Sequence, residues 1–432
     1  MKYWYKIHKW TSLICAIFLF IMCFSALPLI FGREIAAFNQ VSNPANSVVV
    51  TAAAADLSVS RLAETAVARY PGYDLRAIYL DHANQTIGFS LQGAGKGYQY
   101  TRLDLNTGQF AERSNQQVKY EFIQQFINFM YRMHVDMYLG SFGRQVLGFM
   151  CGLSVVALIS GLWLYAPFMK TAAFGSLRTT SRRGYWMDWH KLLGIVTLSW
   201  TVLLSISGFI FVFAGPAHNA WNEHIRREFL QAYEGKPFPE QRISLDSALA
   251  SAKTALPDRR ITGLELPQAG GKMPWHYTVR TQGEGFGAYV NKSVWVDAAT
   301  GEITAIPEQP WYLQAFSMAS PVHFSNHDTL PLKILWFVTD GLTCIMIITG
   351  IYAWFVKFSP DKGKAAANKQ PAVKPVRPVR QSAWQIWRLP AAIIVLTLFG
   401  LIAPLAGREW NDASALALAI PLVLTVYHWW RQ

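Results

Sequence analysis

Long runs of apolar residues, separated by stretches of mixed polarity, dominate the chain. A helix needs about 20 apolar residues to cross a bilayer. Four runs meet that length, near residues 11–31, 145–166, 191–213 and 332–356. Two shorter runs, near 389–405 and 413–430, fit a helical hairpin. The pattern therefore predicts six membrane-spanning helices.

Two polar stretches interrupt this series, one after the first span and one after the third. Each holds roughly 100 residues, enough for a small domain, and each carries strand and turn signals, so we expect an α+β module in both. The expected parts are TM1 at 1–35, module 1 with a terminal interfacial helix at 36–140, TM2 at 141–168, a loop at 169–189, TM3 at 190–214, module 2 at 215–322, TM4 at 323–358, a linker at 359–386 and a TM5–TM6 hairpin at 387–432.

Charge and composition support a membrane protein. Lysine and arginine cluster before the first span, between the second and third, and after the fourth. Because such clusters stay in the cytoplasm, both termini are expected there and both modules on the opposite side. Hydrophobic residues make up 52% and charged residues 15% of the chain, which excludes a disordered protein. The net charge of +13 lies beside the spans, so membrane lipid is the expected partner and nucleic acid is not.

The chain contains an internal repeat, which is visible in the spacing of its histidines. His8 and His190 each open a span, with a Trp four residues earlier and a Lys directly after. His134 and His323 each stand 27 residues before a glycine in the following span. Each half is therefore a span, an external α+β module and a returning span.

Two local features accompany the repeat. The segments Asp104-Leu-Asn-Thr-Gly108 and Asp297-Ala-Ala-Thr-Gly301 have Asp and Gly where a tight turn needs them, which predicts a strand, a turn and a strand in both modules. Gly140 and Gly143 are expected to separate the helix that carries His134 from the second span.

The repeat leaves one histidine at each membrane end of each half. Two neutral imidazoles that face each other across a helical bundle are the usual protein ligands of a six-coordinate haem. The alternative is that each histidine packs in the core or at the interface and only satisfies its hydrogen bonds. Zinc fits less well, because two histidines at each face leave a tetrahedral ion short of ligands.

A set of motifs over residues 1 to about 358 gives the chain a family likeness. These motifs are His8-Lys9-Trp10, His134 with Gly140 and Gly143, Gly161-Leu-Trp163, His190-Lys-Leu-Leu-Gly194 with Ser207-Gly208, Val296-Asp-Ala-Ala-Thr-Gly-Glu302, His323-Phe324, Leu330-Pro-Leu-Lys333 and Gly350-Ile-Tyr-Ala-Trp354. With them the chain resembles the PepSY-associated transmembrane proteins, which include iron-regulated inner-membrane proteins and ferric-siderophore reductases of Gram-negative bacteria. The fold that the resemblance implies is an α-helical integral membrane bundle of about six helices, with an internal two-fold repeat and two periplasmic α+β PepSY-like modules.

The resemblance to the siderophore reductases also implies an activity. The chain would be an inner-membrane oxidoreductase with two haem b groups, one between His8 and His190 on the cytoplasmic side and one between His134 and His323 on the periplasmic side. Electrons would pass to a periplasmic ferric siderophore and release Fe(II) for iron uptake. The chain carries no convincing nucleotide-binding loop, so a separate cytoplasmic reductase or quinol would be the electron donor.

Arg144 and Lys333, each ten residues after an external histidine, could pair with haem propionates, as could Arg132. Snorkelling to lipid headgroups is the alternative for all three.

The other histidines carry weaker expectations. His327 lies four residues after His323 and is the alternative external ligand. His218 and His224 follow the third span, where they line the substrate approach, bind a third centre or are solvated loop residues. We assign no role to His82, His276 and His428.

Two other classes of function remain open. A PepSY module can act as a binding or inhibitory element, so the chain would then be a scaffold or regulator for an envelope peptidase and would bind no haem. It would otherwise be a component of a siderophore or metal transporter. Against transport, we expect no buried acid and no pair of broken helices at the centre of the spans.

Overall fold

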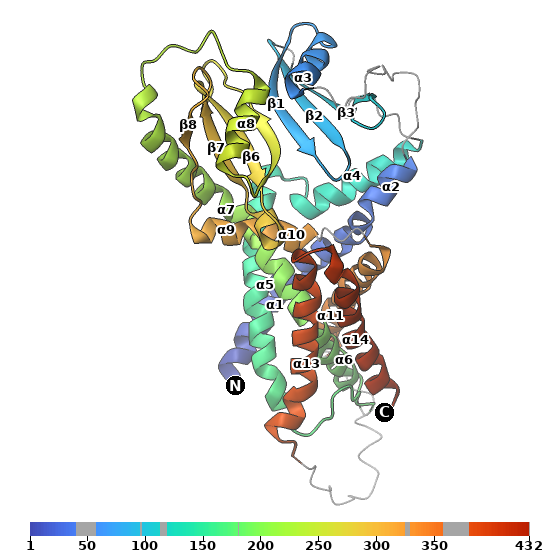
Figure 1. Cartoon of the computed structure of the whole chain (residues 1–432). Coiled ribbons are helices and arrows are strands. Elements are labelled where there is room, and N and C mark those ends of the chain that lie inside the picture. The colour runs from blue at the N-terminus through green and yellow to red at the C-terminus, as the bar shows by residue number, and fades with distance from the viewer. Residues whose placement is uncertain are drawn as a thin grey trace, which may run out of the picture. The chain divides into compact units, whose positions relative to one another are not determined.

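The computed structural model describes residues 1–39, 58–95, 97–112, 119–179, 181–324, 329–356 and 380–431 (Figure 1). The chain divides into two compact units. The helical unit contains Met1–Ala36, Phe122–Ala214 and Ala319–Gln432, and the α+β unit contains Ala37–Glu121 and Gly215–Met318.

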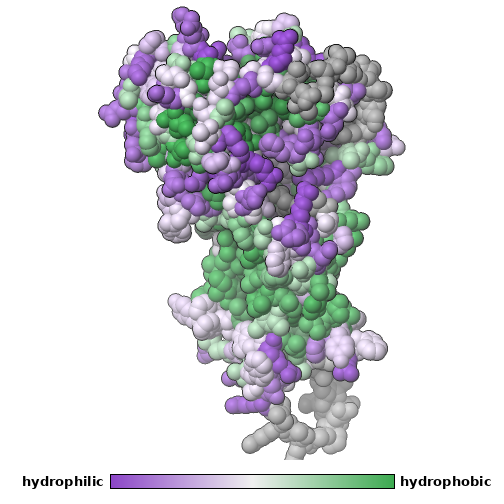
Figure 2. All heavy atoms as spheres, in the orientation of Figure 1, coloured by the Kyte–Doolittle hydropathy of each residue, from purple (hydrophilic) through white to green (hydrophobic). Residues whose placement is uncertain are grey.

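Six of the described helices are long and apolar enough to cross a membrane, which confirms the six predicted spans. Exposed aromatic and aliphatic side chains such as Phe149, Trp163 and Val423 cover their outward faces. In Figure 2 the surface of the helices forms a broad green band, the colour of hydrophobic residues. Such a surface suits lipid rather than water, so the chain is a multi-pass membrane protein. The helices are α1 (Lys2–Ile30), α5 (Gly140–Phe168), α7 (Leu198–Leu230), α11 (Leu330–Phe355), α13 (Ala383–Ile402) and α14 (Asn411–Trp430).

The third span differs from its expected bounds of 190–214. Helix α6 (Arg182–Val196) ends before Thr197, and α7 then continues to Leu230. Thr197 is buried, and its hydroxyl donates to the carbonyl of Leu193 at 2.9 Å. A threonine that bonds back to the preceding turn offers the backbone an alternative to a regular helix, which gives a local reason for the interruption.

Three other expected boundaries also shift. Helix α11 begins at Leu330 rather than at residue 323, and His323 lies on the short helix α10 (Ala319–Phe324). Helix α4 (Glu121–Val135), which was expected to close module 1, groups with the helical unit from Phe122 onward. Of the linker expected at 359–386, the part up to residue 379 lies outside the described residues, and α13 begins at Ala383.

The α+β unit is built on one antiparallel sheet of eight strands, in the order β4-β3-β2-β1-β5-β6-β7-β8. The two outer strands have only three residues each, which limits the unpaired backbone at the sheet edges. The strands are β1 (Tyr73–Asp81), β2 (Thr86–Gly93), β3 (Tyr98–Asp104), β4 (Phe110–Glu112), β5 (Arg260–Glu265), β6 (His276–Gln282), β7 (Lys292–Asp297) and β8 (Ile303–Ala305).

The predicted turns after Asp104 and Asp297 are present in both halves. Oδ1 of Asp104 accepts two backbone N–H bonds across its turn, at 2.8 and 3.0 Å, and Oδ1 of Asp297 accepts two at 2.8 and 2.9 Å. Gly108 and Gly301 follow with φ of 66° and 80°, a backbone conformation that glycine adopts without strain.

The two α+β modules predicted as separate domains form one folded unit instead. Strand β1 of the first pairs antiparallel with β5 of the second, with Ile78 opposite Leu264. This pairing satisfies two strand edges that would be open in isolated modules. The carboxylate of Asp246, in α8 (Leu245–Ala255), also accepts the N–H groups of Val59 and Ser60, in α3 (Val59–Ala68), at 2.8 and 3.2 Å. Both repeats therefore share one hydrophobic core.

Candidate functional site

His8 on α1 and His190 on α6 face each other inside the helical unit. Their ring centroids are 6.3 Å apart and their planes are tilted by 49°. With metal–nitrogen bonds of about 2 Å, a metal held between two opposed imidazoles places the ring centres roughly 6 Å apart. The spacing of this pair therefore fits an ion bound between the two rings.

Hydrogen bonds fix the tautomer of both rings. Nδ1 of His8 lies 2.8 Å from the carbonyl oxygen of Ala157, and Nδ1 of His190 lies 2.9 Å from that of Met346. A carbonyl oxygen only accepts, so each Nδ1 carries the proton and donates it. The lone pair of each Nε2 is left for a metal, and the rings are held in place by the same bonds.

Glycines make room for the two rings. A Cβ on Gly161 of α5 would lie 2.9 Å from Cε1 of His8, and a Cβ on Gly350 of α11 would lie 2.7 Å from Nδ1 of His190. Any other residue at these positions would force the imidazole to move. The two glycines hold equivalent positions in the repeat, and each makes room for one imidazole of the pair.

His134 on α4 and His323 on α10 form a second pair, with ring centroids 6.0 Å apart and planes tilted by 59°. Nδ1 of His134 lies 2.9 Å from the carbonyl oxygen of Met22. Nδ1 of His323 lies 2.9 Å from Oγ of Ser207, whose own proton is donated to the carbonyl of Leu203. Ser207 therefore accepts from His323, and in both rings Nε2 carries the lone pair that can bind a metal.

Both rings of the second pair are neutral at physiological pH. Burial lowers the pKa of His134, and burial together with the neighbouring His134 lowers the pKa of His323 to about 3. A neutral imidazole is the form that binds a metal. The two histidine pairs that the repeat predicted are thus both present, while haem binding by either pair stays a prediction.

The groups that support each pair follow the same repeat. Ala157 stands 23 residues after His134, and Met346 stands 23 after His323. Ser25 and Ser207 each stand 17 residues after the histidine that opens their own half, and Ser25 lies 3.3 Å from Nδ1 of His134. Each half therefore supplies one ligand to each pair and also supplies the groups that hydrogen-bond to those two histidines.

A break between α4 and α5 presents His134, as predicted from Gly140 and Gly143. Oδ1 of Asp136 accepts the backbone N–H of Tyr138 at 3.0 Å and closes the turn. Gly140 has a φ of 61°, and a Cβ on Gly143 would lie only 1.9 Å from the carbonyl oxygen of Asp136. Glycine adopts the conformation at 140 without strain, and the close approach at 143 requires a residue that has no side chain.

A cavity of about 670 Å³ adjoins the second pair. His134 and His323 line it, together with Arg144, Lys333 and mainly apolar side chains. Lys333 forms an ion pair with Glu34. Arg132 instead pairs with Asp136 at 3.1 Å. Two of the three basic residues expected near haem propionates thus face the space where such a group would lie.

The composition of the two sites bears on which metal group they suit. In the described part of the chain, no three side chains of His, Cys, Asp or Glu gather around one point. Two imidazoles alone suit an iron whose remaining ligands come from a macrocycle. The ring spacing of both pairs and, at the second pair, the adjoining cavity therefore fit a haem better than a bare ion.

The other histidines within the described ranges do not join either pair. His327 lies outside the described residues. His218 and His224 lie on α7, so the expectation of a loop after the third span was wrong; the helix continues through both. His224 is 3.8 Å from Glu228 on the exposed surface of that helix. The three to which no role was given lie elsewhere: His82 is exposed beside β1, His276 is buried in β6, and His428 packs on Phe174 from α14.

Asp340 overturns one expectation from the sequence. We expected no buried acid at the centre of the spans, yet Asp340 lies within α11, is only 2% exposed and lines the 670 Å³ cavity. Asp340 is visible in the sequence of the fourth apolar run, but the burial of its side chain became evident only from the structure. The objection to transport that rested on the absence of such a residue therefore falls.

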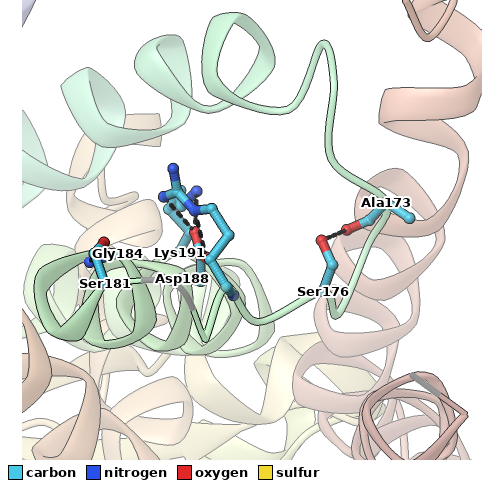
Figure 3. Close-up of polar contacts among 7 residues, drawn as sticks. Ala173, Ser176, Ser181, Gly184, Asp188 and Lys191 are labelled. Carbon is cyan, nitrogen blue, oxygen red and sulfur yellow. Dashed lines mark hydrogen bonds and ion pairs between the residues drawn. The ribbon is translucent and has the colours of Figure 1, made fainter. Parts of the chain in front are cut away.

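Asp188, which the sequence did not single out, anchors the helix that carries His190. Its carboxylate accepts from Nε and Nη2 of Arg178, both at 2.8 Å, and lies 2.6 Å from Nζ of Lys191. Figure 3 shows Asp188 and Lys191 together on α6, with the bond from Ser176 to Ala173 in the preceding loop. The available signal was the spacing of three residues between Asp188 and Lys191, which places opposite charges on one face of a helix.

The fold and the sites define a class: a duplicated multi-pass membrane protein with a helical bundle, an antiparallel sheet and two facing pairs of histidines. The model of the PepSY-associated TM region family matches residues 5–357. This is most of the chain, which therefore belongs to that family. No curated protein matches the chain.

Proposed function

We propose that this protein is a di-haem oxidoreductase that carries electrons across the bacterial inner membrane and reduces a ferric siderophore. The observation that carries the proposal is the geometry of the two histidine pairs. In each, two neutral imidazoles face each other at the spacing of axial ligands, with Nδ1 bonded and Nε2 free. Haem supplies a one-electron centre when it is bound between two such rings.

The spacing of the pairs along the bundle suits transfer across a bilayer. His8 and Met22, whose carbonyl binds His134, are 14 residues apart on α1. At 1.5 Å per residue, this separates the levels of the two pairs by roughly 21 Å. The hydrocarbon core is ~30 Å thick, so one pair near each face divides the crossing into shorter steps.

The residues around each pair would prepare it for its task. The carbonyls of Ala157 and Met346 hold the rings of His8 and His190 in the ligating tautomer. Arg144 and Lys333 supply positive charge beside the second pair, where they would meet the propionate groups.

The family resemblance and the charge distribution support a proposal for the substrate and the donor. With both termini in the cytoplasm, His134 and His323 would lie at the periplasmic side, where a ferric siderophore would accept the electron and release Fe(II). A separate flavin reductase or quinol would deliver electrons near His8 and His190. Helices α13 and α14, beyond the repeated core, offer a docking surface for that donor.

The test is an absorption spectrum of the detergent-purified protein, oxidised and dithionite-reduced, with a pyridine haemochrome count. We expect two haem b per chain that reoxidise without oxygen when a ferric siderophore is added. A colourless protein, produced in cells supplied with haem, would refute the proposal and favour the PepSY scaffold. Haem that does not respond to a ferric siderophore would refute the substrate and retain the cofactor.

A further inference from the structure

Three acids are buried in the described part of the helical unit, and Asp340 differs from the other two. Asp136 and Asp188 are each 5% exposed, and each is paired with a cation: Asp136 with Arg132 at 3.1 Å, and Asp188 with Lys191 at 2.6 Å. Asp340 is 2% exposed, and neither of its carboxylate oxygens has a hydrogen-bond partner among the described residues. Asp340 therefore has no cation among the described residues to offset its burial, whereas Asp136 and Asp188 each have one.

Asp340 and the polar groups near it line the cavity beside the second histidine pair. The Cys23 thiol on α1 and the indole N–H of Trp200 on α7 lie near its carboxylate. Nε1 of Trp200 is buried and also lacks a partner within the described ranges. Unsatisfied polar atoms that line one cavity mark a place that can bind a proton, a water or a ligand. The titratable groups that share this cavity are Cys23, Tyr131, His134, Arg144, Cys151, His323 and Lys333.

An ionised carboxylate in this position is costly unless a positive charge lies nearby. Lys333 stands seven residues from Asp340, roughly 10 Å along α11, and is paired with Glu34. The group in this cavity whose charge would change is the metal centre between His134 and His323, which loses one positive charge on reduction. A carboxylate can be compensated by the oxidised centre and not by the reduced one.

We propose that Asp340 binds a proton when the centre held by His134 and His323 is reduced, and releases it when that centre is oxidised. The inference rests on the proposed function. One electron arrives from the flavin or quinol donor, one proton from water joins the carboxylate to form the acid, and the net charge in the cavity stays constant. When the electron leaves to the ferric acceptor, the proton returns to water.

Asp340 has no acidic counterpart in the first half of the repeat. Asp340 stands 17 residues after His323, and the residue 17 after His134 is Cys151, which lines the same cavity. The proton site is therefore a feature of the His134–His323 cavity added on α11, and not a general part of the duplicated scaffold.

The experiment is a redox-difference infrared spectrum of the full-length haem-loaded protein in lipid nanodiscs, in water and in deuterium oxide. On reduction we expect a carboxylic-acid C=O band to appear and to shift in deuterium oxide. The band should be absent in Asp340→Asn and displaced in Asp340→Glu. Asp412→Asn, an exposed acid in the first turn of α14, is the matched control and should keep the band.

A potentiometric titration gives a second readout. In the wild type, the reduction potential of one haem should fall as the pH rises. The fall should be at most about 59 mV per pH unit, which is the value for one proton taken up with one electron. Asp340→Asn should flatten this dependence. A wild-type protein with two haems but no redox-linked band would overturn the coupling while the proposed function stands. A protein without haem would overturn both, and the haemochrome count taken first separates the two outcomes.

Discussion

The Cβ that Gly350 lacks would lie 2.7 Å from Nδ1 of His190, so the glycine on α11 and the histidine on α6 share one space. This contact predicts that Gly350→Ala displaces the imidazole and removes about half of the bound haem, counted by pyridine haemochrome. Gly341→Ala, on the same helix but with nothing within 4 Å of its Cβ, is the matched control. Equal haem in both variants would contradict the role given to Gly350.

The four paired histidines should each be needed for one haem. Because a haem that loses one of its two axial imidazoles is held more weakly, His8→Ala, His134→Ala, His190→Ala and His323→Ala should each lower haem per chain by about half. His82→Ala, an exposed residue of the α+β unit, should change nothing. Full haem in any of the first four variants would show that the ligand is assigned wrongly.

Ser207 should tune the second pair. It accepts from Nδ1 of His323 at 2.9 Å, whereas Ser25 lies 3.3 Å from His134, which already donates to the carbonyl of Met22. Since partners of a ligating imidazole affect affinity by about 10–100-fold, Ser207→Ala should weaken haem binding, and Ser25→Ala should weaken it less. Haem transfer to apomyoglobin measures the loss. The opposite order would refute this account of the hydrogen bonds.

The site around Asp188 should lose stability in acid. Burial alone raises the pKa of Asp188, but hydrogen bonds from Arg178 and Lys191 outweigh it, and the pKa is lowered overall. A carboxyl group with a lowered folded pKa contributes stability that is complete above its unfolded value and is lost as pH falls through the folded one. The thermal unfolding temperature should therefore drop below about pH 4.

Asp188→Asn supplies the comparison for this pH series. It should be less stable than the wild type at neutral pH, by on the order of 3 kcal/mol for a broken buried pair, and its unfolding temperature should respond less to acid. Asp412→Asn, at an exposed acid, should follow the wild type. Parallel acid profiles of wild type and Asp188→Asn would exclude the ion pair as the cause.

The histidine pairs could be predicted because they depend on local spacing that the duplication copied. His8 and His190 open their spans in the same way, and the distance from His134 to Gly161 equals that from His323 to Gly350. The break at Gly140 was also predictable, since glycine marks positions where the backbone must take a left-handed conformation.

The features that escaped prediction depend on contacts between distant parts of the chain or on a single residue. The pairing of β1 with β5 joins residues nearly 190 positions apart, such as Ile78 and Leu264. Neither strand carries a local sequence signal that identifies the other as its partner. The third span is interrupted at Thr197, and the nearby Gly194 did not lead us to expect a break there. Asp340 lies among apolar residues in the sequence, and its burial depends on how α11 packs against other helices.

The junction of β1 and β5 has a consequence for the origin of the chain. The strand order reads the same outward from that junction in both directions, from β1 to β4 and from β5 to β8, as in an interface between two identical subunits. A chain with one repeat would have an open β1 edge and would complete its sheet by homodimerisation. Fusion fixes that pairing within one molecule and frees the two copies to diverge, so that aspartate could arise at position 340 while its counterpart at 151 is cysteine.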